Sequence, residues 1–335
     1  MDFKLHSEFP VQLEKEWNAL LAESITHVPF LRYEYLFNWW QTRGGGEWPS
    51  SAELAIVTAH EAGQLIGIAP FFCTLYNNQP SCLFLGSIEI SDYLDFIVRQ
   101  KDLPAFLEGL LGFLPLKEAR LELYNFLESS PSITQLQKVA VHLGWQYGSE
   151  TTNHAPIIKL PGDWEDYLAS LDKKQRHEIR RKIRRLEGAE VPTRWYIVEN
   201  DENLDNEINH FLGLMAQDPE KEAFLTEEMV ATMSGTIHTA FQHGYLQLAF
   251  LEIDGQKAAT YLNFDYDNHL WIYNSGLDRN FMSFSPGWVL LGYLLRWANE
   301  QGKACFDFMR GDEEYKYRFG ATDRFVKHIT LFHND

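Results

Sequence analysis

Cysteine is scarce in this sequence. Its 335 residues include only three cysteines, Cys73, Cys82 and Cys305, which lie far apart and are odd in number. Their spacing matches no cysteine-based metal site, and a chain stabilised by a disulfide framework would carry more of them. We therefore expect neither a metal site nor a disulfide framework, and a reducing cytoplasmic compartment fits best.

Long hydrophobic runs are also missing. The longest apolar helical stretch, Val289 to Leu295, is far shorter than the ~20 residues that a membrane-spanning helix needs. The opening segment, Met1 to Trp17, carries several lysines and glutamates and has no apolar core of the kind found in signal peptides. The sequence therefore predicts no membrane span and no secretion signal.

Basic residues are few. The 29 Lys and Arg residues stand against 47 Asp and Glu, which gives a formal net charge of -18. A domain that coats nucleic acid is usually basic because it must neutralise phosphates, so DNA is not an expected partner. Acidity of this kind favours solubility. With 45% hydrophobic and 14% aromatic residues, the chain can build one large or two ordinary globular domains.

Familiar catalytic motifs are absent as well. The sequence contains neither the G-x-S-x-G of serine hydrolases nor the H-E-x-x-H of zinc proteases. Its 12 histidines are scattered, and His142, His210 and His238, which lie in predicted helices, are expected to be structural. Neither serine hydrolase nor metal-dependent chemistry is predicted.

What the sequence does contain is a repeated α/β pattern. Strand-like runs flank an acidic turn with glycine twice, at Glu61-Ala62-Gly63 and at Asp254-Gly255, which predicts two β-hairpins. Around each hairpin the order is the same: helices, the hairpin, a further strand, a helix and a strand. Duplication would produce this order, and convergence on a common hairpin pattern is the alternative. We predict helices at 11–24, 31–42, 103–114, 131–143, 164–171, 173–187, 203–217, 226–243 and 286–301, and strands at 54–59, 65–72, 81–85, 120–123, 193–198, 246–253, 257–265, 269–277 and 304–308.

A break in this pattern divides the chain. Residues 149–163 are rich in Thr, Asn, Pro and Gly, and a strongly basic helix follows them. We predict an N-terminal half at 1–160, a basic helical connector at 161–190 and a C-terminal half at 191–335. The expected fold class is α/β (α+β).

The basic helix is the first candidate site. At about 100° per residue, an apolar stripe of Ile179, Ile183 and Leu186 docks the helix. The cations beside this stripe are Lys173, Arg176, Arg180 and Arg184. Because the planar fork of Arg suits phosphate, this flank could hold an anion at the edge of a cleft. A solvated charged helix is the alternative.

The second candidate site is the strand and loop at 306–320. Asp307, Arg310, Tyr315 and Lys316 lie where a strand runs into a charged loop with glycine. Such strand ends are where α/β folds place groups that bind ligands. A solvated turn held by local ion pairs is the alternative.

The third candidate is the segment 91–96. Asp92 stands beside Tyr93 in an apolar neighbourhood, where a carboxylate can have a raised pKa and act as a general base. An aspartate that caps a turn is the alternative.

The fourth candidate is the start of the helix predicted at 286–301. Ser285, Pro286 and Gly287 suit a helix N-terminus whose free N–H groups could hold a pyrophosphate. An ordinary capped helix start is the alternative.

Taken in order, these segments resemble a known family. The set of residues 91–96, the basic helix, Pro286-Gly287, Asp307 to Gly311 and Tyr315-Lys316 is similar to GNAT-superfamily acetyltransferases of the CelD-like and BioF2-like type. That type is in turn similar to the Fem-type aminoacyltransferases of peptidoglycan synthesis. The resemblance implies tandem GNAT-like halves, each a mixed twisted sheet flanked by helices, with a substrate cleft between the halves.

The resemblance also implies roles for matching residues. Catalytic roles fall on Asp92, Tyr93, Lys316 and Arg310; substrate or anion binding falls on Lys173, Arg176, Arg180, Asp95, Tyr273, Asp307 and Tyr315; cofactor binding falls on Ser285, Pro286 and Gly287. The glycine-rich pyrophosphate loop of GNAT enzymes is reduced here to the last three residues. This departure leaves open whether the donor is acetyl-CoA, another acyl-CoA or an aminoacyl-tRNA.

The sequence therefore predicts a cytoplasmic GNAT-type acyltransferase, an N-acetyltransferase first of all. It would move an acyl group from acyl-CoA to an amine or hydroxyl of an anionic acceptor linked to a sugar or nucleotide. One alternative is a Fem-type enzyme that uses aminoacyl-tRNA, although the acidity of the chain weighs against extensive RNA contact. Another is a non-catalytic GNAT fold that binds a precursor in polysaccharide or cell-envelope assembly. In the enzymatic case, we expect the cations of the basic helix and the loop that holds Lys316 to meet in one pocket.

Overall fold

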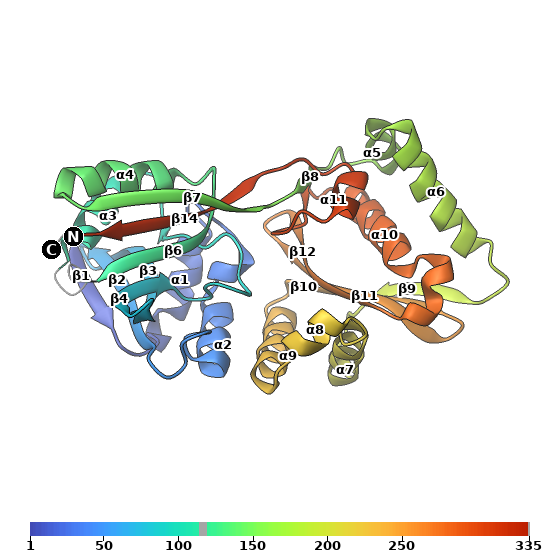
Figure 1. The fold of residues 1–335 in the computed structure, drawn as a ribbon, viewed down its shortest axis with the longest axis horizontal. Coiled ribbons are helices and arrows are strands. Elements are labelled where there is room, and N and C mark those ends of the chain that lie inside the picture. The colour runs from blue at the N-terminus through green and yellow to red at the C-terminus, as the bar shows by residue number, and fades with distance from the viewer. Residues whose placement is uncertain (114–118, 334–335) are drawn as a thin grey trace. The chain divides into compact units, whose positions relative to one another are not determined.

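The computed structural model describes residues 1–113 and 119–333. The chain folds as two compact units (Figure 1). Unit 1 comprises Met1–His154 together with the segment from Arg324 onward, and unit 2 comprises Ala155–Asp323. The mixed α/β architecture predicted for both halves is confirmed, but the division differs from the predicted one. The basic segment is part of unit 2, and the last strand belongs to unit 1.

Unit 1 is built on a mixed sheet. Its strands are β1 (Asp2–His6), β2 (Glu53–Glu61), β3 (Gln64–Tyr76), β4 (Gln79–Phe84), β5 (Ile97–Val98), β6 (Arg120–Leu127), β7 (Gln146–His154) and β14 (Phe325–Phe332). They are ordered β1-β2-β3-β4-β6-β14-β7, and β5 pairs with β3. The helices are α1 (Glu14–Leu21), α2 (Tyr33–Arg43), α3 (Leu103–Gly112) and α4 (Pro131–Leu143), with short 3-10 helices η1 (Val11–Leu13) and η2 (Pro29–Leu31). The helix predicted at 103–114 is α3, and residue 114 lies outside the described residues.

The strands missed by the sequence analysis are the polar or isolated ones. β7 is exposed along most of its length, so it lacks the alternation of apolar and polar residues that marks a half-buried strand. Most of this strand therefore lies in the segment 149–163 that the sequence predicts as a break. β14 does alternate, with Val326, Ile329 and Leu331 fully buried. It pairs with β6 on one side and β7 on the other, both antiparallel.

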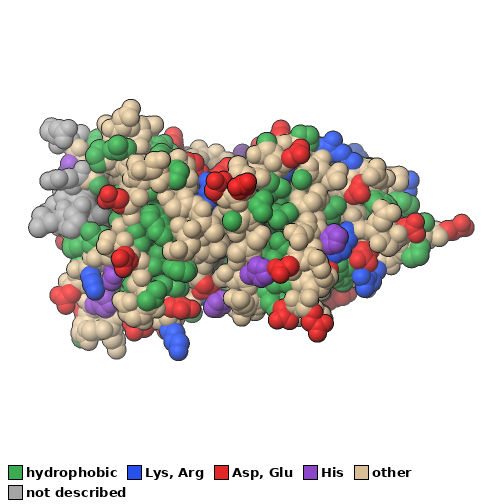
Figure 2. Space-filling model, turned by 90° about the horizontal axis from the view of Figure 1, so that it is seen from below, with side chains coloured by type: hydrophobic (Ala, Val, Ile, Leu, Met, Phe, Trp, Pro, Cys, Tyr) green, Lys and Arg blue, Asp and Glu red, His purple; other side chains and the backbone are tan. Residues whose placement is uncertain are grey.

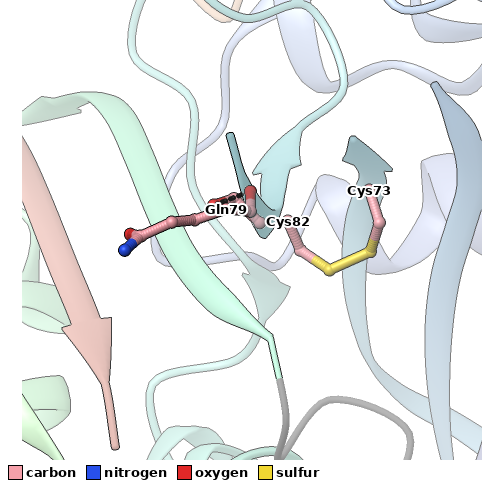
Figure 3. Close-up of a disulfide and its surroundings, with 4 residues drawn as sticks. Cys73, Gln79 and Cys82 are labelled. Carbon is pink, nitrogen blue, oxygen red and sulfur yellow. Dashed lines mark hydrogen bonds between the residues drawn. A yellow bond between two sulfur atoms is a disulfide. The ribbon is translucent and has the colours of Figure 1, made fainter. Parts of the chain in front are cut away.

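A disulfide joins β3 to β4, which shows that the expectation of no disulfide is wrong. Cys73 and Cys82 lie opposite each other in the register of this hairpin, with their Cα atoms 4.0 Å apart (Figure 3). The turn between the strands is Asn77-Asn78, and both residues have positive φ, as the tightest hairpin turns require. The turn fixes the register and thereby brings the two cysteines together. The prediction of a reducing compartment rested on the cysteine pattern and loses that support.

Unit 2 has the same plan. Its strands are β8 (Ile157–Lys159), β9 (Thr193–Ile197), β10 (Leu246–Ile253), β11 (Gln256–Tyr266), β12 (His269–Leu277) and β13 (Cys305–Asp307), in the order β8-β13-β12-β11-β10-β9. The helices are α5 (Trp164–Ser170), α6 (Lys173–Glu187), α7 (Leu204–Met215), α8 (Pro219–Phe224), α9 (Glu227–Gln242), α10 (Pro286–Glu300) and α11 (Glu314–Arg318), with the 3-10 helix η4 (Arg279–Phe284). Both predicted hairpins, β2–β3 and β10–β11, are confirmed.

Helices cover both faces of the sheet of unit 2. Figure 1 shows α6 and α10 on one face and α7 and α9 on the other. At two glycines, helices pack closely on one another or on the sheet. A Cβ atom on Gly292 of α10 would lie 3.1 Å from Ile183 of α6, and one on Gly276 of β12 would lie 2.5 Å from the backbone of Leu214 in α7. Because α6 packs here through Ile179 and Leu186, it belongs to the core of unit 2 and is not a separate connector.

The acidic surface is dispersed. On the face shown in Figure 2, Asp and Glu side chains are scattered among hydrophobic and neutral ones and form no single acidic patch. Among the described residues, no helix has the length and apolar character needed to cross a bilayer. The same residues contain no group of three or more His, Cys, Asp or Glu side chains placed to hold a metal ion.

His328 links β14 to both of its neighbouring strands. Its Nε2 lies 2.6 Å from Glu122 Oε2 on β6, and its Nδ1 lies 2.8 Å from Glu150 Oε1 on β7. The imidazole also stacks on Tyr124, with ring centroids 3.7 Å apart. Burial lowers the pKa of His328, but its hydrogen bonds to the two carboxylates outweigh burial and hold the pKa above its ordinary value of 6.5.

This pair predicts a pH dependence of stability. Because the pKa of His328 is raised on folding, its contribution is complete below 6.5 and is lost as the pH rises through the folded pKa. The pKa of Glu122 is lowered from 4.5, so its contribution is lost as the pH falls below that value. Between pH 6.5 and 9, H328Q should therefore show a flatter loss of stability than wild type in urea unfolding. H142Q, which changes an exposed histidine of α4, is the control, and equal slopes in wild type and H328Q would contradict the assignment.

Candidate acyl-transfer site in unit 2

In unit 1, the segment that follows β4 contains the predicted Asp92 and Tyr93. β4 and β6 are parallel neighbours only at Ser81 and Cys82, and beyond these residues the chain turns into this segment. Asp92 is 6% exposed and Tyr93 is 1% exposed. The hydroxyl oxygen of Tyr93 accepts a hydrogen bond of 3.1 Å from Arg324, whose guanidinium also lies over the tyrosine ring. The structure thus brings both predicted residues into the interior of unit 1, beside the start of the segment that forms β14.

Asp95 does not have the surroundings of a substrate-binding residue. It is 1% exposed, and its carboxylate accepts hydrogen bonds from the hydroxyls of Thr26, Ser130 and Ser132 and from the backbone N–H of Phe96. Burial raises the pKa of this carboxyl, although the hydroxyl donors oppose the rise. With both oxygens engaged inside the unit, Asp95 ties the start of α4 to the loop before β5. The role of Asp95 in substrate binding stays a prediction.

In unit 2, the sheet opens between β12 and β13. The two strands pair in parallel from His269 and Cys305 to Trp271 and Asp307, where β13 ends while β12 continues to Leu277. Beside the opening, the register between β11 and β12 shifts so that Tyr273 is an extra residue, a β-bulge. Bulges reorient the backbone locally and are common next to active sites. Tyr273, predicted to bind substrate, therefore lies at the opening.

The helix that follows β12 begins at the predicted cofactor residues. Ser285 has φ 55° and makes no side-chain cap, and Pro286 has no N–H to offer. The first backbone bond of α10 runs from the N–H of Val289 to the carbonyl of Ser285. Within the described part of the chain, no hydrogen bond uses the backbone N–H of Gly287 or Trp288. A helix N-terminus with free N–H groups is a site for anions.

Two further features fit an anion at this end of α10. The indole Nε1 of Trp288 is buried and has no hydrogen-bond partner among the described residues. The ammonium group of Lys182, from α6, lies 4.0 Å from the centroid of the Trp288 ring. Burial lowers the pKa of Lys182 more than the neighbouring Glu178 raises it. These groups suit a ligand that bears a phosphate.

The loop after β13 is held by Lys316. This lysine of α11 is 3% exposed and donates hydrogen bonds to the carbonyls of Arg310 (2.9 Å) and Gly311 (3.1 Å), and its ammonium group pairs with Glu313 at 2.9 Å. At the head of the loop, Asp307 is fully buried and accepts a hydrogen bond from the N–H of Met309. All three N–H donors of Lys316 are thus engaged within its own loop.

Tyr315 lies between the loop after β13 and the start of α10. Its ring meets Phe308 edge to face, with centroids 6.0 Å apart. Burial raises the pKa of Tyr261, and Tyr315 adds to this rise. Tyr261 in turn donates a long hydrogen bond of 3.4 Å to the carbonyl of Gly287. Burial raises the pKa of Tyr315, with a smaller effect of Glu313 in the same direction. The loop after β13 and the start of α10 therefore flank the opening together.

The cations of α6 that were predicted to bind an anion have other surroundings in unit 2. Arg180 pairs with Glu165, and Arg176 donates a long hydrogen bond to the carbonyl of Ala169. Lys173 is exposed in the first turn. A cavity of about 530 Å³ is lined by Trp164, Glu165, His177, Arg180, Ile183, Arg184, Glu187, Tyr293 and Arg296. Lys316 is not among these lining residues, so this cavity does not unite the helix cations with the loop as the sequence analysis expected.

One residue at the opening was missed by the sequence analysis. Lys221 of α8 donates hydrogen bonds to Asn274 Oδ1 (3.0 Å) and to the carbonyl of Ser275 (2.5 Å), both on β12. The sequence offers no signal for this contact, because the two segments are distant along the chain and α8 is too short to show a clear pattern. Lys221 borders a second cavity of about 340 Å³ in unit 2.

Comparison with known proteins agrees with this geometry. Residues 173–317 match the family model of the acetyltransferase (GNAT) domain, and this segment contains β12, α10 and β13. No curated protein matches the sequence.

Solved structures resemble the whole chain. The structure of FemX superposes with a TM-score of 0.67 at 11% identity, over 98% of this chain and 97% of FemX. A conserved protein of unknown function from Bacteroides thetaiotaomicron VPI-5482 gives 0.64 at 12% identity, over 99% and 100% of the two chains. The C-terminal domain (DUF2156) of a putative lysylphosphatidylglycerol synthetase from Agrobacterium fabrum gives 0.57 at 10% identity, over 97% and 93%. At these identities the likeness is one of fold.

The sequence-based resemblance is thereby confirmed. The family match covers the segment that holds the opening, and the structural likeness extends over both units. Residues 173–317 of unit 2 therefore carry an acetyltransferase (GNAT) domain, and the fold of the whole chain is like that of FemX.

Proposed function

We propose that unit 2 transfers an acyl group from an acyl-CoA, acetyl-CoA first of all, to an amine or hydroxyl of an anionic acceptor. The observation that carries this proposal is the parting of β12 and β13 beside the free N-terminus of α10, within the acetyltransferase segment. Bound acyl-CoA would supply a thioester, whose carbonyl carbon is open to attack by the acceptor and whose coenzyme A would leave as the thiol. The protein's own residues would hold the donor, orient the acceptor and stabilise the developing negative charge.

The start of α10 would hold the pyrophosphate of the donor. The N–H groups of Gly287 and Trp288 would donate to its oxygens, and the helix dipole would add to their effect. Lys182 would supply positive charge from the neighbouring helix. The backbone of β12 around the bulge at Tyr273 would donate to the oxyanion, because it lines the opening.

The loop after β13 would keep the opening in shape. We assign Lys316 a positioning role, since its ammonium group ties the backbone at residues 310 and 311. Arg310 would then face phosphate or other anionic groups of the substrate. Asp92 and Tyr93 lie in the interior of unit 1, and the roles of base and neighbour that we propose for them rest on the sequence.

The acceptor would be anionic and linked to a sugar or nucleotide. The support is the row of cations along α6, where Arg180 and Arg184 line a cavity beside Trp164 and Tyr293. Lys173 and Arg176 would extend this binding surface. We place the reaction in the cytoplasm, where acyl-CoA is available, although disulfides such as that between Cys73 and Cys82 are rare there.

A different donor is favoured by a specific observation. The fold of the whole chain resembles FemX, and the basic helix α6 would suit an aminoacyl-tRNA. A protein that contacts many RNA phosphates loses affinity steeply as salt rises. Filter binding to charged tRNA at about 50 and 200 mM salt separates the donors. Tight, strongly salt-dependent binding would favour aminoacyl-tRNA as the donor. If acyl-CoA is the donor, we expect no binding of tRNA. If calorimetry detects neither tRNA nor acetyl-CoA binding, a non-catalytic role in polysaccharide assembly is favoured instead.

The first prediction concerns the start of α10. In G287D a carboxylate would stand in the place assigned to the pyrophosphate, and it fits sterically because a Cβ there meets only Leu277, at 3.5 Å. We expect the KM for acetyl-CoA to rise by about tenfold, equivalent to about 1.4 kcal/mol. The measurement is thiol release from acetyl-CoA with amino sugars and nucleotide-linked sugars as acceptors. G213D places the same charge on α7 and should leave the KM unchanged; an unchanged KM in G287D would refute the pyrophosphate site.

The second prediction concerns Lys316. Replacing it by Met leaves the carbonyls of Arg310 and Gly311 and the carboxylate of Glu313 without their donor. We expect the acyl-transfer rate of K316M to fall on the order of a hundredfold, through misplacement of the loop. Because this role is positional, K316R should recover part of the rate. K174M, on the exposed side of α6, is the control, and full activity in K316M would remove Lys316 from the site.

A further inference from the structure

The proposed acyl transfer assigns no role to the cavity beside Lys221. It has a volume of about 340 Å³ and lies at the end of β12, on the face covered by α7 and α8. It is lined by Leu214, Met215, Gln217, Asp218, Lys221, Ser275, Gly276, Leu277, Arg279 and Met282. Part of this wall is apolar and part is charged. The cavity therefore suits a ligand with both characters.

The wall of the cavity is fixed by close packing. Because a Cβ on Gly276 would lie 2.5 Å from the backbone of Leu214 and of Met215, the end of α7 rests directly on β12. Leu214 and Met215 come from this contact, and Leu277 continues the apolar wall along β12. Cavities of this kind, formed by backbone contact, exist before a ligand arrives. Their shape selects a branched apolar group of modest size.

Lys221 provides a cation that the protein balances only in part. Its ammonium group donates to an amide oxygen of Asn274, to a backbone carbonyl and, at 3.4 Å, to the hydroxyl of Ser275. All of these acceptors are neutral, and within the described chain no carboxylate lies within ion-pair distance of this group. Burial lowers the pKa of Lys221 more than Asp218 and Glu313 raise it. A partly buried cation of this kind is stabilised by an anionic ligand.

The mouth of the cavity favours a single negative charge. Arg279 is largely exposed, and its guanidinium lies 4.0 Å from the carboxylate of Asp218. Asp218 would repel a dianion such as a phosphate ester, which in addition prefers paired Arg forks or free backbone N–H groups. Near Lys221 the structure offers a point-like ammonium group instead. A carboxylate matches this arrangement.

We propose that the cavity binds a carboxylate on Lys221 and a branched apolar group against Leu214, Met215 and Leu277. The ligand class is an apolar amino acid or a compound that ends in one. That this compound is the acceptor rests on the proposed function, and the binding itself does not. Ser275 and Gly276 lie on the part of β12 that extends beyond β13, so the bound compound would lie along the strand that lines the opening.

The test is calorimetry with a matched pair of probes, 4-methylpentanoate and 4-methylpentanamide, without any acyl donor. The two share the branched apolar group and differ in the carboxylate. We expect the acid to bind wild type at least about tenfold more tightly than the amide, which corresponds to about 1.4 kcal/mol. In K221M the preference should disappear, whereas K101M, an exposed lysine of unit 1, should keep it. Equal binding of the two probes to wild type, or an unchanged preference in K221M, would overturn the proposal.

A second variant covers the case in which K221M fails to fold. Met282 is 55% exposed at the rim of the cavity, so M282W should fold normally and obstruct the entrance. We expect it to weaken binding of the acid by about tenfold, and unchanged binding would count against the cavity. The result is separable from the proposed function. Failure of acyl transfer with the acid preference intact would refute the donor site, and transfer without that preference would refute the cavity.

Discussion

The sheet of unit 1 depends on a strand, β14, that follows the whole of unit 2 in the chain. In unit 1, β6 is covered by β14, which arrives only after the chain has passed through unit 2. In unit 2, β13 is covered by β8, which follows directly from unit 1. Both covering strands are antiparallel to a strand that is itself parallel to its other neighbour, but β8 is an edge strand whereas β14 is followed by β7. The segment of β8 also anchors the candidate site, because Phe308, at the head of the loop after β13, donates its N–H to the carbonyl of Pro156.

The cations of unit 2 each have a different kind of partner. Lys316 donates to backbone carbonyls, Arg180 pairs with a glutamate, and Lys221 donates to neutral oxygens of β12. Lys221 is set apart by being partly buried while all of its acceptors are neutral. The start of α10 adds backbone N–H groups to these charges. The chemistry of the site thus depends on which cations are left unbalanced, and much less on how many there are.

Local patterns in the sequence predicted much of the fold. The acidic turns with glycine gave both hairpins, the apolar stripe of the basic helix gave its packing face, and Pro286 marked the start of α10. Contacts between distant segments could not be predicted from these local patterns. Nothing in the alternation of β14 says which sheet it joins, and Cys73 and Cys82 meet because of a turn of two asparagines. In the candidate site, the surroundings of Asp95 could not be predicted because its hydroxyl donors lie in other elements, and Lys221 gave no signal because its acceptors lie on a distant strand.

The position of β14 has a consequence for synthesis. On the ribosome, every other strand of the sheet of unit 1 emerges before unit 2 begins, yet the place between β6 and β7 must wait until unit 2 has been made. In the interval, two polypeptide edges with unpaired backbone groups face a vacant slot. The nascent chain must keep that slot clear of foreign strands, because the piece that fits it is the last to arrive. Because every residue of unit 2 precedes β14, unit 2 can reach its final form before unit 1 does.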